Sequence, residues 1–229
     1  MSNLGIIIQA RSGSKRFPKK ILQLIGNKNV LEHVILRVKK TKFKKKIIIA
    51  STQKKADKII RFVAKNNNCD FFFGNENNVL ERFFLAAKKF KLKDIIRICA
   101  DSPFIDPHII ENALVHYKKG DHDIVSNTKS RTFPKGMSVE IFSFETLKKA
   151  IQLAKTRYEK EHVTQVMYKN TRIFRIKNLT NTSKISKYSF ALDYPGELGF
   201  LRKIYSNLLK KKISNKFNLK NLIQIAKNV

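Results

Sequence analysis

Short apolar runs that alternate with amphipathic segments constrain the fold of this chain more than any other feature of its sequence. The first run is Leu4–Ala10, and similar runs recur at 47–50, 70–73, 95–100 and 124–126. Strands buried on both faces have this composition, because helices cover both sides of a parallel sheet. The alternation therefore predicts an α/β fold with a mostly parallel sheet and helices on both faces.

Segments of helical periodicity separate these runs. The stretches 30–38, 59–64 and 79–90 place apolar residues three or four positions apart, which is typical of helices that bury one face. The pair Asp106-Pro107 predicts the start of another helix, since aspartate is a common N-cap and proline is favoured at the first helical position.

Beyond Asn127 the pattern of apolar residues changes and predicts three further strands and two further helices. The strands are expected over 137–142, 172–176 and 188–192, and the helices over 144–154 and from Pro195 onward. No internal repeat, low-complexity linker or break in composition divides the chain. We therefore expect a single domain over 1–229, with a small inserted lobe at about 128–187.

The strongly basic composition raises the question of nucleic-acid binding. The chain carries 48 Lys and Arg against 17 Asp and Glu, a formal net charge of +31, which is typical of proteins that bind nucleic acid. The lysines are nevertheless spread over every segment, and the densest groups, at 42–46 and 210–212, fall where predicted helices end and attract cations. This distribution favours a solvated surface, and a basic nucleic-acid-binding protein is the less favoured alternative.

Cysteine spacing and hydropathy indicate the compartment. Cys69 and Cys99 match neither a disulfide framework nor a zinc site, which favours a reducing environment. No window approaches the ~18 consecutive apolar residues that a membrane helix needs, and the run Leu4–Ile8 is too short for a signal peptide. We therefore expect a cytoplasmic protein with no membrane partner.

A basic loop, residues Arg11–Lys20, follows the first predicted strand, at the sheet edge where doubly wound proteins bind ligands. Its small residues allow backbone amides to approach an anion, and its positive side chains would surround that anion. The small residues are Ser12, Gly13 and Ser14, and the positive ones are Arg11, Lys15, Arg16 and Lys20. The spacing matches neither a P-loop nor a dinucleotide-binding turn. The loop predicts a triphosphate site, and an ordinary basic surface loop is the alternative.

Two aspartates follow predicted strands. Asp101 ends the run 95–100 and Asp193 ends the run 188–192, so we expect both at the same sheet edge as the basic loop. Two carboxylates with phosphate oxygens and waters suit Mg²⁺, which would offset charge on a transferring phosphoryl group. Helix capping is the alternative for each aspartate, because each precedes a helix that begins with proline.

Five blocks of residues occur in order between about Leu4 and Leu208. They are Gln9-Ala10-Arg11-x-Gly13-Ser14-x-Arg16-x-Pro18-x-Lys20, Gly74 with Val79-Leu80-Glu81-Arg82, Arg97-x-x-x-Asp101-x-Pro103-x-Ile105-Asp106, Pro134-x-Gly136-x-x-Val139-Glu140, and Glu161-His162-Val163-Thr164. Together they resemble the cytidylyltransferases that make CMP-activated sugars, in particular the SpsF-like branch of spore-coat polysaccharide synthesis. The CMP-Kdo and CMP-sialic acid synthetases are more distantly similar. The stretch Asp193-Tyr194-Pro195-Gly196-Glu197-Leu198 looks like that family's closing segment.

This resemblance implies a Rossmann-like nucleotidyltransferase fold and a reaction. The enzyme would transfer CMP from CTP to the hydroxyl of a sugar acid with release of pyrophosphate, in surface polysaccharide or glycan biosynthesis, with Mg²⁺ as cofactor. A homodimer is also implied, with the lobe at 128–187 serving sugar binding or dimerisation.

The resemblance also implies roles for individual residues. The nucleotide-binding set is Ala10, Arg11, Ser12, Gly13, Ser14, Lys15, Arg16, Lys20, Arg82 and Arg97, within which Arg11 and Lys20, together with Asp101, would be catalytic. Asp101 and Asp193 would hold the metal. The sugar-facing set is Pro134, Gly136, Glu140, His162 and Thr164, and His162 is also a candidate general base.

Two departures from the family pattern affect these expectations. Lys19 stands where the family commonly has glycine, so the turn there is expected to differ or to bring an extra charge to the phosphates. Gly196-Glu197 replaces Glu-Asp, which leaves open where the last long helix starts. A glycosyltransferase that uses a sugar nucleotide, and a nucleotidyltransferase specific for another NTP, are the enzymatic alternatives.

Overall fold

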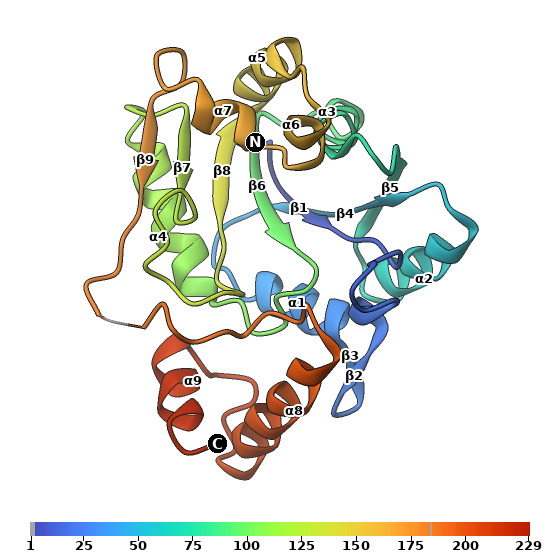
Figure 1. The fold of residues 1–229 in the computed structure, drawn as a ribbon, viewed down its shortest axis with the longest axis vertical. Helices are drawn as coiled ribbons and strands as arrows, with labels where there is room; N and C mark the ends of the chain where they lie inside the picture. The colour runs from blue at the N-terminus through green and yellow to red at the C-terminus, as the bar shows by residue number, and fades with distance from the viewer. Residues whose placement is uncertain (1–2, 184) are drawn as a thin grey trace.

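The computed structural model describes residues 3–183 and 185–229. In this part of the chain a seven-stranded sheet has the strand order β5-β4-β1-β6-β8-β7-β9 (Figure 1). The strands are β1 (Leu4–Gln9), β4 (Lys46–Thr52), β5 (Asp70–Gly74), β6 (Asp94–Cys99), β7 (Ile124–Ser126), β8 (Glu140–Ser143) and β9 (Ile176–Asn178). Two short strands, β2 (Leu24–Ile25) and β3 (Lys28–Asn29), form a separate hairpin.

The pairing of the strands confirms the expected α/β class. β1 lies parallel to both β4 and β6, and β4 lies parallel to β5. β8 is the antiparallel exception, inserted between β6 and β7, while β9 lies parallel to β7. The sheet is therefore mostly parallel, with an antiparallel strand contributed by the region after Asn127.

Helices cover both faces of this sheet. They are α1 (Val30–Lys39), α2 (Lys58–Asn66), α3 (Val79–Lys89), α4 (Pro107–Lys118), α5 (Phe144–Leu153), α6 (Arg157–Glu161), α7 (Gln165–Lys169), α8 (Pro195–Lys210) and α9 (Leu219–Ala226). α8 and α9 lie together at one end of the molecule, next to the C-terminus (Figure 1). No helix in the ranges 3–183 and 185–229 is long and apolar enough to cross a membrane.

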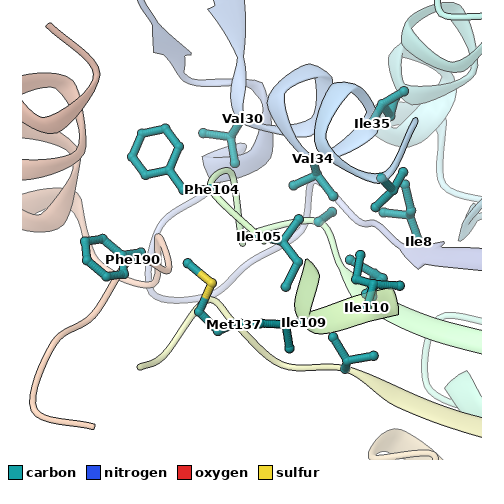
Figure 2. Packing of buried hydrophobic residues seen from close by; sticks show 14 of the residues in the cluster. Ile8, Val30, Val34, Ile35, Phe104, Ile105, Ile109, Ile110, Met137 and Phe190 are labelled. Carbon is teal, nitrogen blue, oxygen red and sulfur yellow. The ribbon is translucent and has the colours of Figure 1, made fainter. Parts of the chain in front are cut away.

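The buried side chains form two clusters, one on each face of the sheet. Ile6 and Ile8 of β1 belong to the cluster that contains α1 and α4, whereas Ile7 belongs to the cluster that contains α3 and α5. This division follows from the alternation of side chains along a strand. Figure 2 shows Met137 and Phe190 in the first cluster, together with side chains of α1 and α4. The continuous apolar run of β1 is thus explained by burial on both faces.

Three of the strand predictions after Asn127 need correction. The strand expected over 137–142 begins only at Glu140, because the Asn127 side chain bonds the backbone of Met137 and Val139 in place of a neighbouring strand. The strand expected over 172–176 is misplaced: β9 begins at Ile176 and the preceding residues form a turn.

The third correction concerns 188–192, which is extended but is not a strand of the sheet. Ser189 forms only an isolated bridge with Lys135. Its neighbours divide their hydrogen bonds between two partners: Phe190 donates to Lys135 O at 2.9 Å, and Leu192 donates to Asp101 O at 2.9 Å. A regular ladder to one strand is therefore not formed.

The region 128–187 contributes β8 and β9 to the same sheet as the N-terminal strands. Its expected role as a sugar-binding or dimerisation lobe stays a prediction. Cys69 and Cys99 are both free thiols.

Candidate active site

The basic loop leaves the end of β1 and closes through a left-handed residue. Lys19 has φ of 57° and ψ of 23° and is followed by a short 3₁₀ helix at Lys20–Leu22. Glycine adopts this backbone region most easily, and in this chain a lysine adopts it. The turn directs the Lys20 side chain inward, where only 10% of it is exposed.

Lys20 joins the two aspartates that the sequence analysis placed at the metal site. Its Nζ lies 2.8 Å from Asp101 Oδ2 and 2.9 Å from Asp193 Oδ1. Arg16 donates to the same Asp193 oxygen at 2.9 Å. Burial tends to lower the pKa of Lys20, but the two carboxylates outweigh it and raise that pKa. Burial also tends to raise the pKa of Asp193, and the contacts with Lys20 and Arg16 lower it instead. Lys20 and Asp193 are therefore both charged near neutral pH.

Backbone contacts of the segment before Asp193 explain how this residue comes to lie beside Lys20 although no strand precedes it. Gly136 has φ of +86°, and a Cβ there would lie 2.6 Å from the carbonyl carbon of Phe190. This close approach brings the segment that precedes Asp193 against the backbone at Gly136, and the bond from Leu192 to Asp101 O fixes its end. The Glu197 carboxylate then accepts hydrogen bonds from the amides of Asp193 and Tyr194, so that α8 begins at Pro195.

These charged groups line one cavity of about 450 Å³. Among the predicted residues, its wall contains Arg11, Gly13, Ser14, Lys15, Arg16, Lys20, Asp101 and Asp193. Ala10 and Ser12 are absent from this wall and are 1% and 4% exposed. The basic loop and Asp193, which lie more than 170 positions apart in the chain, therefore converge on one cavity.

A second cavity of about 400 Å³ adjoins the first, because Cys99 lines both. Its wall contains the predicted Arg97, Glu140, His162 and Thr164, together with Lys129, Arg131 and Tyr168. Pro134 and Gly136 belong to the wall of neither cavity. The structure gives Gly136 a backbone-packing position instead.

A buried network fixes the floor of the second cavity. The Glu140 carboxylate accepts hydrogen bonds from Arg97, Tyr168 and Thr164, the last at 2.7 Å. Burial alone would raise the pKa of Glu140, but Arg97 and the two hydroxyls lower it. The same carboxylate raises the pKa of Arg97 against the opposing effect of burial. Glu140 is therefore a charged residue whose charge is already balanced within the protein.

The contacts of Arg97 and Arg82 differ from those expected of nucleotide-binding residues. Arg97 is occupied by Glu140 and by Gln9 Oε1, which lies 3.0 Å from its NH2. Arg82 is fully buried in α3 and lines neither cavity. Its NH1 donates to Asn75 O at 2.9 Å and so holds the loop that follows β5. Burial, and secondarily Arg11, lower the pKa of Arg82 to about 10.

The two aspartates are placed so that they could hold one divalent cation together. Their carboxylates contact one nitrogen from opposite segments, so both can reach a single cation between them. Within the described ranges, no third histidine, cysteine, aspartate or glutamate joins them to complete a metal site. Mg²⁺ is commonly held by one or two carboxylates together with substrate phosphates, which is the donor set that this cavity offers.

Sequence reasoning missed several residues of these walls. Glu161 was recognised within a block but not as a partner of the basic loop, and its Oε1 lies 3.5 Å from Arg11 NH2. Arg157, at the first position of α6, also lines the first cavity. The capping box of Thr156 and Glu159 signals the start of α6, but no local pattern reveals that α6 faces the basic loop.

The chain is similar to several known proteins. A family model described as cytidylyltransferase matches residues 5–225. An uncharacterized protein of Methanocaldococcus jannaschii is 37% identical over 74% of this chain and 69% of its own length. The spore coat polysaccharide biosynthesis protein SpsF of Bacillus subtilis is 27% identical over 90% of this chain and 87% of its own. The structure of a cytidylyltransferase from Leptospira borgpetersenii superposes with a TM-score of 0.90 and 29% identity, covering 100% of this chain and 95% of that one.

Proposed function

The chain belongs to the cytidylyltransferase family, and from that premise we propose that it transfers CMP from CTP to the hydroxyl of a sugar acid, releasing pyrophosphate. The observation that carries the proposal is the convergence of Lys20, Asp101 and Asp193 in one cavity that the basic loop also lines. Membership of the family makes the chain a nucleotidyltransferase, and its fold is that of structurally known nucleotidyltransferases.

The proposed reaction is an in-line displacement at the α-phosphorus of CTP. The sugar hydroxyl oxygen forms a bond to that phosphorus, the bond to the bridging oxygen of pyrophosphate breaks, and the hydroxyl proton passes to a base, for which His162 is the candidate. Lys20 and Arg16 would neutralise the departing pyrophosphate, since charge stabilisation and positioning supply most of the catalysis in phosphoryl transfer. Arg11 and the amides of Gly13 and Ser14 would hold the triphosphate.

Mg²⁺ is proposed as the cofactor, with Asp101 and Asp193 as its protein ligands. When bound, it would neutralise negative charge on the phosphates. Lys20 would then release the two carboxylates and contact phosphate oxygens, because its ammonium and the metal are alternative counterions for the same groups.

The second cavity supports an acceptor that carries a negative charge. Lys129 and Arg131 line it, whereas its carboxylate, Glu140, is already paired with Arg97. An unbalanced positive lining favours an anionic group on the substrate. A sugar acid presents such a carboxylate beside the hydroxyls that could attack CTP, and His162 lies on the same wall as the candidate proton acceptor.

Three broader features are part of the proposal. The name of the Bacillus subtilis relative places that protein in spore coat polysaccharide biosynthesis, which supports a surface polysaccharide or glycan role here. The homodimer follows from the family resemblance, and the cytoplasmic location follows from the cysteine spacing and hydropathy of the sequence.

Release of pyrophosphate tests the proposed function directly. The purified chain would be incubated with each of the four NTPs and with a panel of sugar acids that includes Kdo and nonulosonic acids, with Mg²⁺ present. We expect release that requires both CTP and a sugar acid. Release of a nucleoside diphosphate from a sugar nucleotide, without pyrophosphate, would instead identify a glycosyltransferase, and a preference for another NTP would correct the base specificity.

A further inference from the structure

Asp57 is a buried carboxylate outside every block of the sequence analysis. It ends a short 3₁₀ turn at Lys55–Asp57 and occupies the N-cap position of α2, and it is 1% exposed. Aspartate at an N-cap ordinarily accepts a hydrogen bond from the first turn of its own helix. The side chain of Asp57 makes no such bond, so its carboxylate is directed elsewhere.

Asp57 instead binds Ser12 of the basic loop, 45 positions away. The Ser12 amide donates to Asp57 Oδ1 at 2.7 Å, and the Ser12 hydroxyl donates to the same oxygen. The second carboxylate oxygen accepts a hydrogen bond from the Thr52 hydroxyl at the end of β4. Hydrogen bonds to an ionised acceptor are about twice as strong as neutral ones, so this carboxylate connects the loop firmly to β4 and α2.

Ser12 in turn organises the rest of the basic loop. Its carbonyl accepts hydrogen bonds from the amides of Ser14, at 3.0 Å, and Lys19, at 2.8 Å. The second of these closes the loop at the left-handed residue directly before Lys20. Ser12 itself faces the interior, whereas Arg11, Gly13 and Ser14 line the cavity. The conformation of both ends of the loop therefore depends on where Ser12 is held.

We propose that Asp57 is a positioning residue of the nucleotide site, which holds Ser12 so that the basic loop presents Arg11, Gly13, Ser14 and Lys20 to the triphosphate. The inference rests on the proposed function. Asp57 touches neither cavity wall described above, and it acts entirely through Ser12. The low pKa of Asp57 agrees with this arrangement: burial would raise it, and the hydrogen bonds from Ser12 and Thr52 lower it.

A matched control exists in Asp106. It is 3% exposed, occupies the N-cap of α4 and likewise connects distant segments, since it accepts a hydrogen bond from the Leu219 amide at 2.6 Å. Its contacts reach α9 rather than the basic loop. Replacement of Asp57 and of Asp106 by alanine should therefore destabilise the protein in similar ways but differ in their effect on CTP.

The test compares Asp57→Ala and Asp106→Ala by calorimetric CTP binding, by steady-state kinetics and by thermal unfolding. We expect Asp57→Ala to weaken CTP binding about tenfold or more, since hydrogen bonds to a charged group are lost. The KM for CTP should rise while the KM for the sugar stays unchanged. Asp106→Ala should lower the melting temperature and leave CTP affinity within about twofold. An Asp57→Ala protein that is destabilised yet binds CTP like the wild type would reduce Asp57 to a structural residue and overturn the proposal.

Hydrogen exchange provides a readout that needs no nucleotide. In Asp57→Ala the amides of Ser12, Ser14 and Lys19 should exchange faster than in the wild type, while those of α9 do not. If Asp57→Ala does not fold, Ser12→Ala removes only the hydroxyl donor and should weaken CTP binding a few-fold; unchanged binding and unchanged exchange would contradict the proposal. A wild type that binds no CTP, but shows the expected exchange pattern across the variants, would refute the proposed function and leave the positioning of the loop intact.

Discussion

The Lys20 ammonium nitrogen lies 2.8 Å from Asp101 Oδ2, although 81 positions separate the two residues in the chain. A single positive side chain thus bridges the loop after β1 and the end of β6, and its second contact adds Asp193. Two carboxylates that face each other need a shared counterion, because like charges in a partly buried site repel. Lys20 supplies that counterion through its contacts with both carboxylates.

Removing the Lys20 charge should make the aspartates available to a divalent cation without nucleotide. We expect Lys20→Met to bind Mn²⁺ about tenfold or more tightly than the wild type, because the metal no longer competes with a tethered ammonium. Electron paramagnetic resonance of free Mn²⁺ measures this directly. Lys44→Met, at an exposed lysine, is the control. Equal Mn²⁺ affinity in wild type and Lys20→Met would show that the two carboxylates do not form a metal site.

The convergence of this site could be predicted from the sequence only in part. Asp101 was placed correctly because it lies two positions after Cys99, the last residue of β6, and carboxyl ends of parallel strands share one edge of a sheet. Asp193 was placed correctly for a partly wrong reason, since the expected strand before it is an extended segment held by Gly136 and by a bond to Asp101 O.

Other features could not be predicted because no local pattern encodes them. The insertion of β8 between β6 and β7 depends on tertiary pairing, and its apolar run fits either direction of the strand. Asp57 lies in a polar turn that resembles any surface loop, and its burial depends on Ser12, which is 45 positions away. Arg82 and Arg97 were assigned to the nucleotide from the resemblance, whereas the structure shows Arg82 NH1 bonded to the Asn75 carbonyl and Arg97 NH1 bonded to Glu140.

Asp101→Asn should abolish most of the activity without unfolding the protein. The amide keeps the shape of the side chain but removes the negative charge, and a metal that has lost a charged ligand stabilises the transition state less. We expect pyrophosphate release from CTP to fall by about a hundredfold or more. Asp121→Asn, at an exposed aspartate, is the control. Near-normal turnover of Asp101→Asn would contradict its assignment as a metal ligand.

Arg11 and Glu161 should have opposite effects on CTP. Their side chains lie 3.5 Å apart and are 36% and 35% exposed, so the ion pair contributes little to stability. Arg11→Ala should weaken CTP binding about tenfold, because a charge-assisted contact to phosphate is lost.

Glu161→Gln should instead strengthen CTP binding a few-fold, because Arg11 is then released from a competing carboxylate and a negative charge is removed near the phosphates. Isothermal titration of CTP into both variants measures the two effects, with thermal unfolding to confirm that stability is retained. A weaker affinity in Glu161→Gln would indicate that Glu161 contributes a favourable contact to the nucleotide complex.

Glu140 should link stability to pH through its pairing with Arg97. The pKa of Glu140 is lower in the folded protein than its usual 4.5, so its stabilising contribution is complete above pH 4.5 and is lost as the pH falls through the folded-state value. Glu140→Gln leaves Arg97 buried without its counterion and should lower the free energy of unfolding at neutral pH by about 3 kcal/mol or more.

The pH profile distinguishes this effect from a simple loss of packing. In Glu140→Gln the fall in stability below pH 4.5 should be shallower than in the wild type, because the group that takes up the proton is gone. Urea denaturation at a series of pH values gives both the neutral difference and the slope, and Glu145→Gln, at an exposed glutamate, controls for the charge change. Parallel acid limbs in Glu140→Gln and wild type would mean that Glu140 does not bind its proton more weakly in the folded protein, and would contradict the charged Arg97–Glu140 pair at the floor of the second cavity.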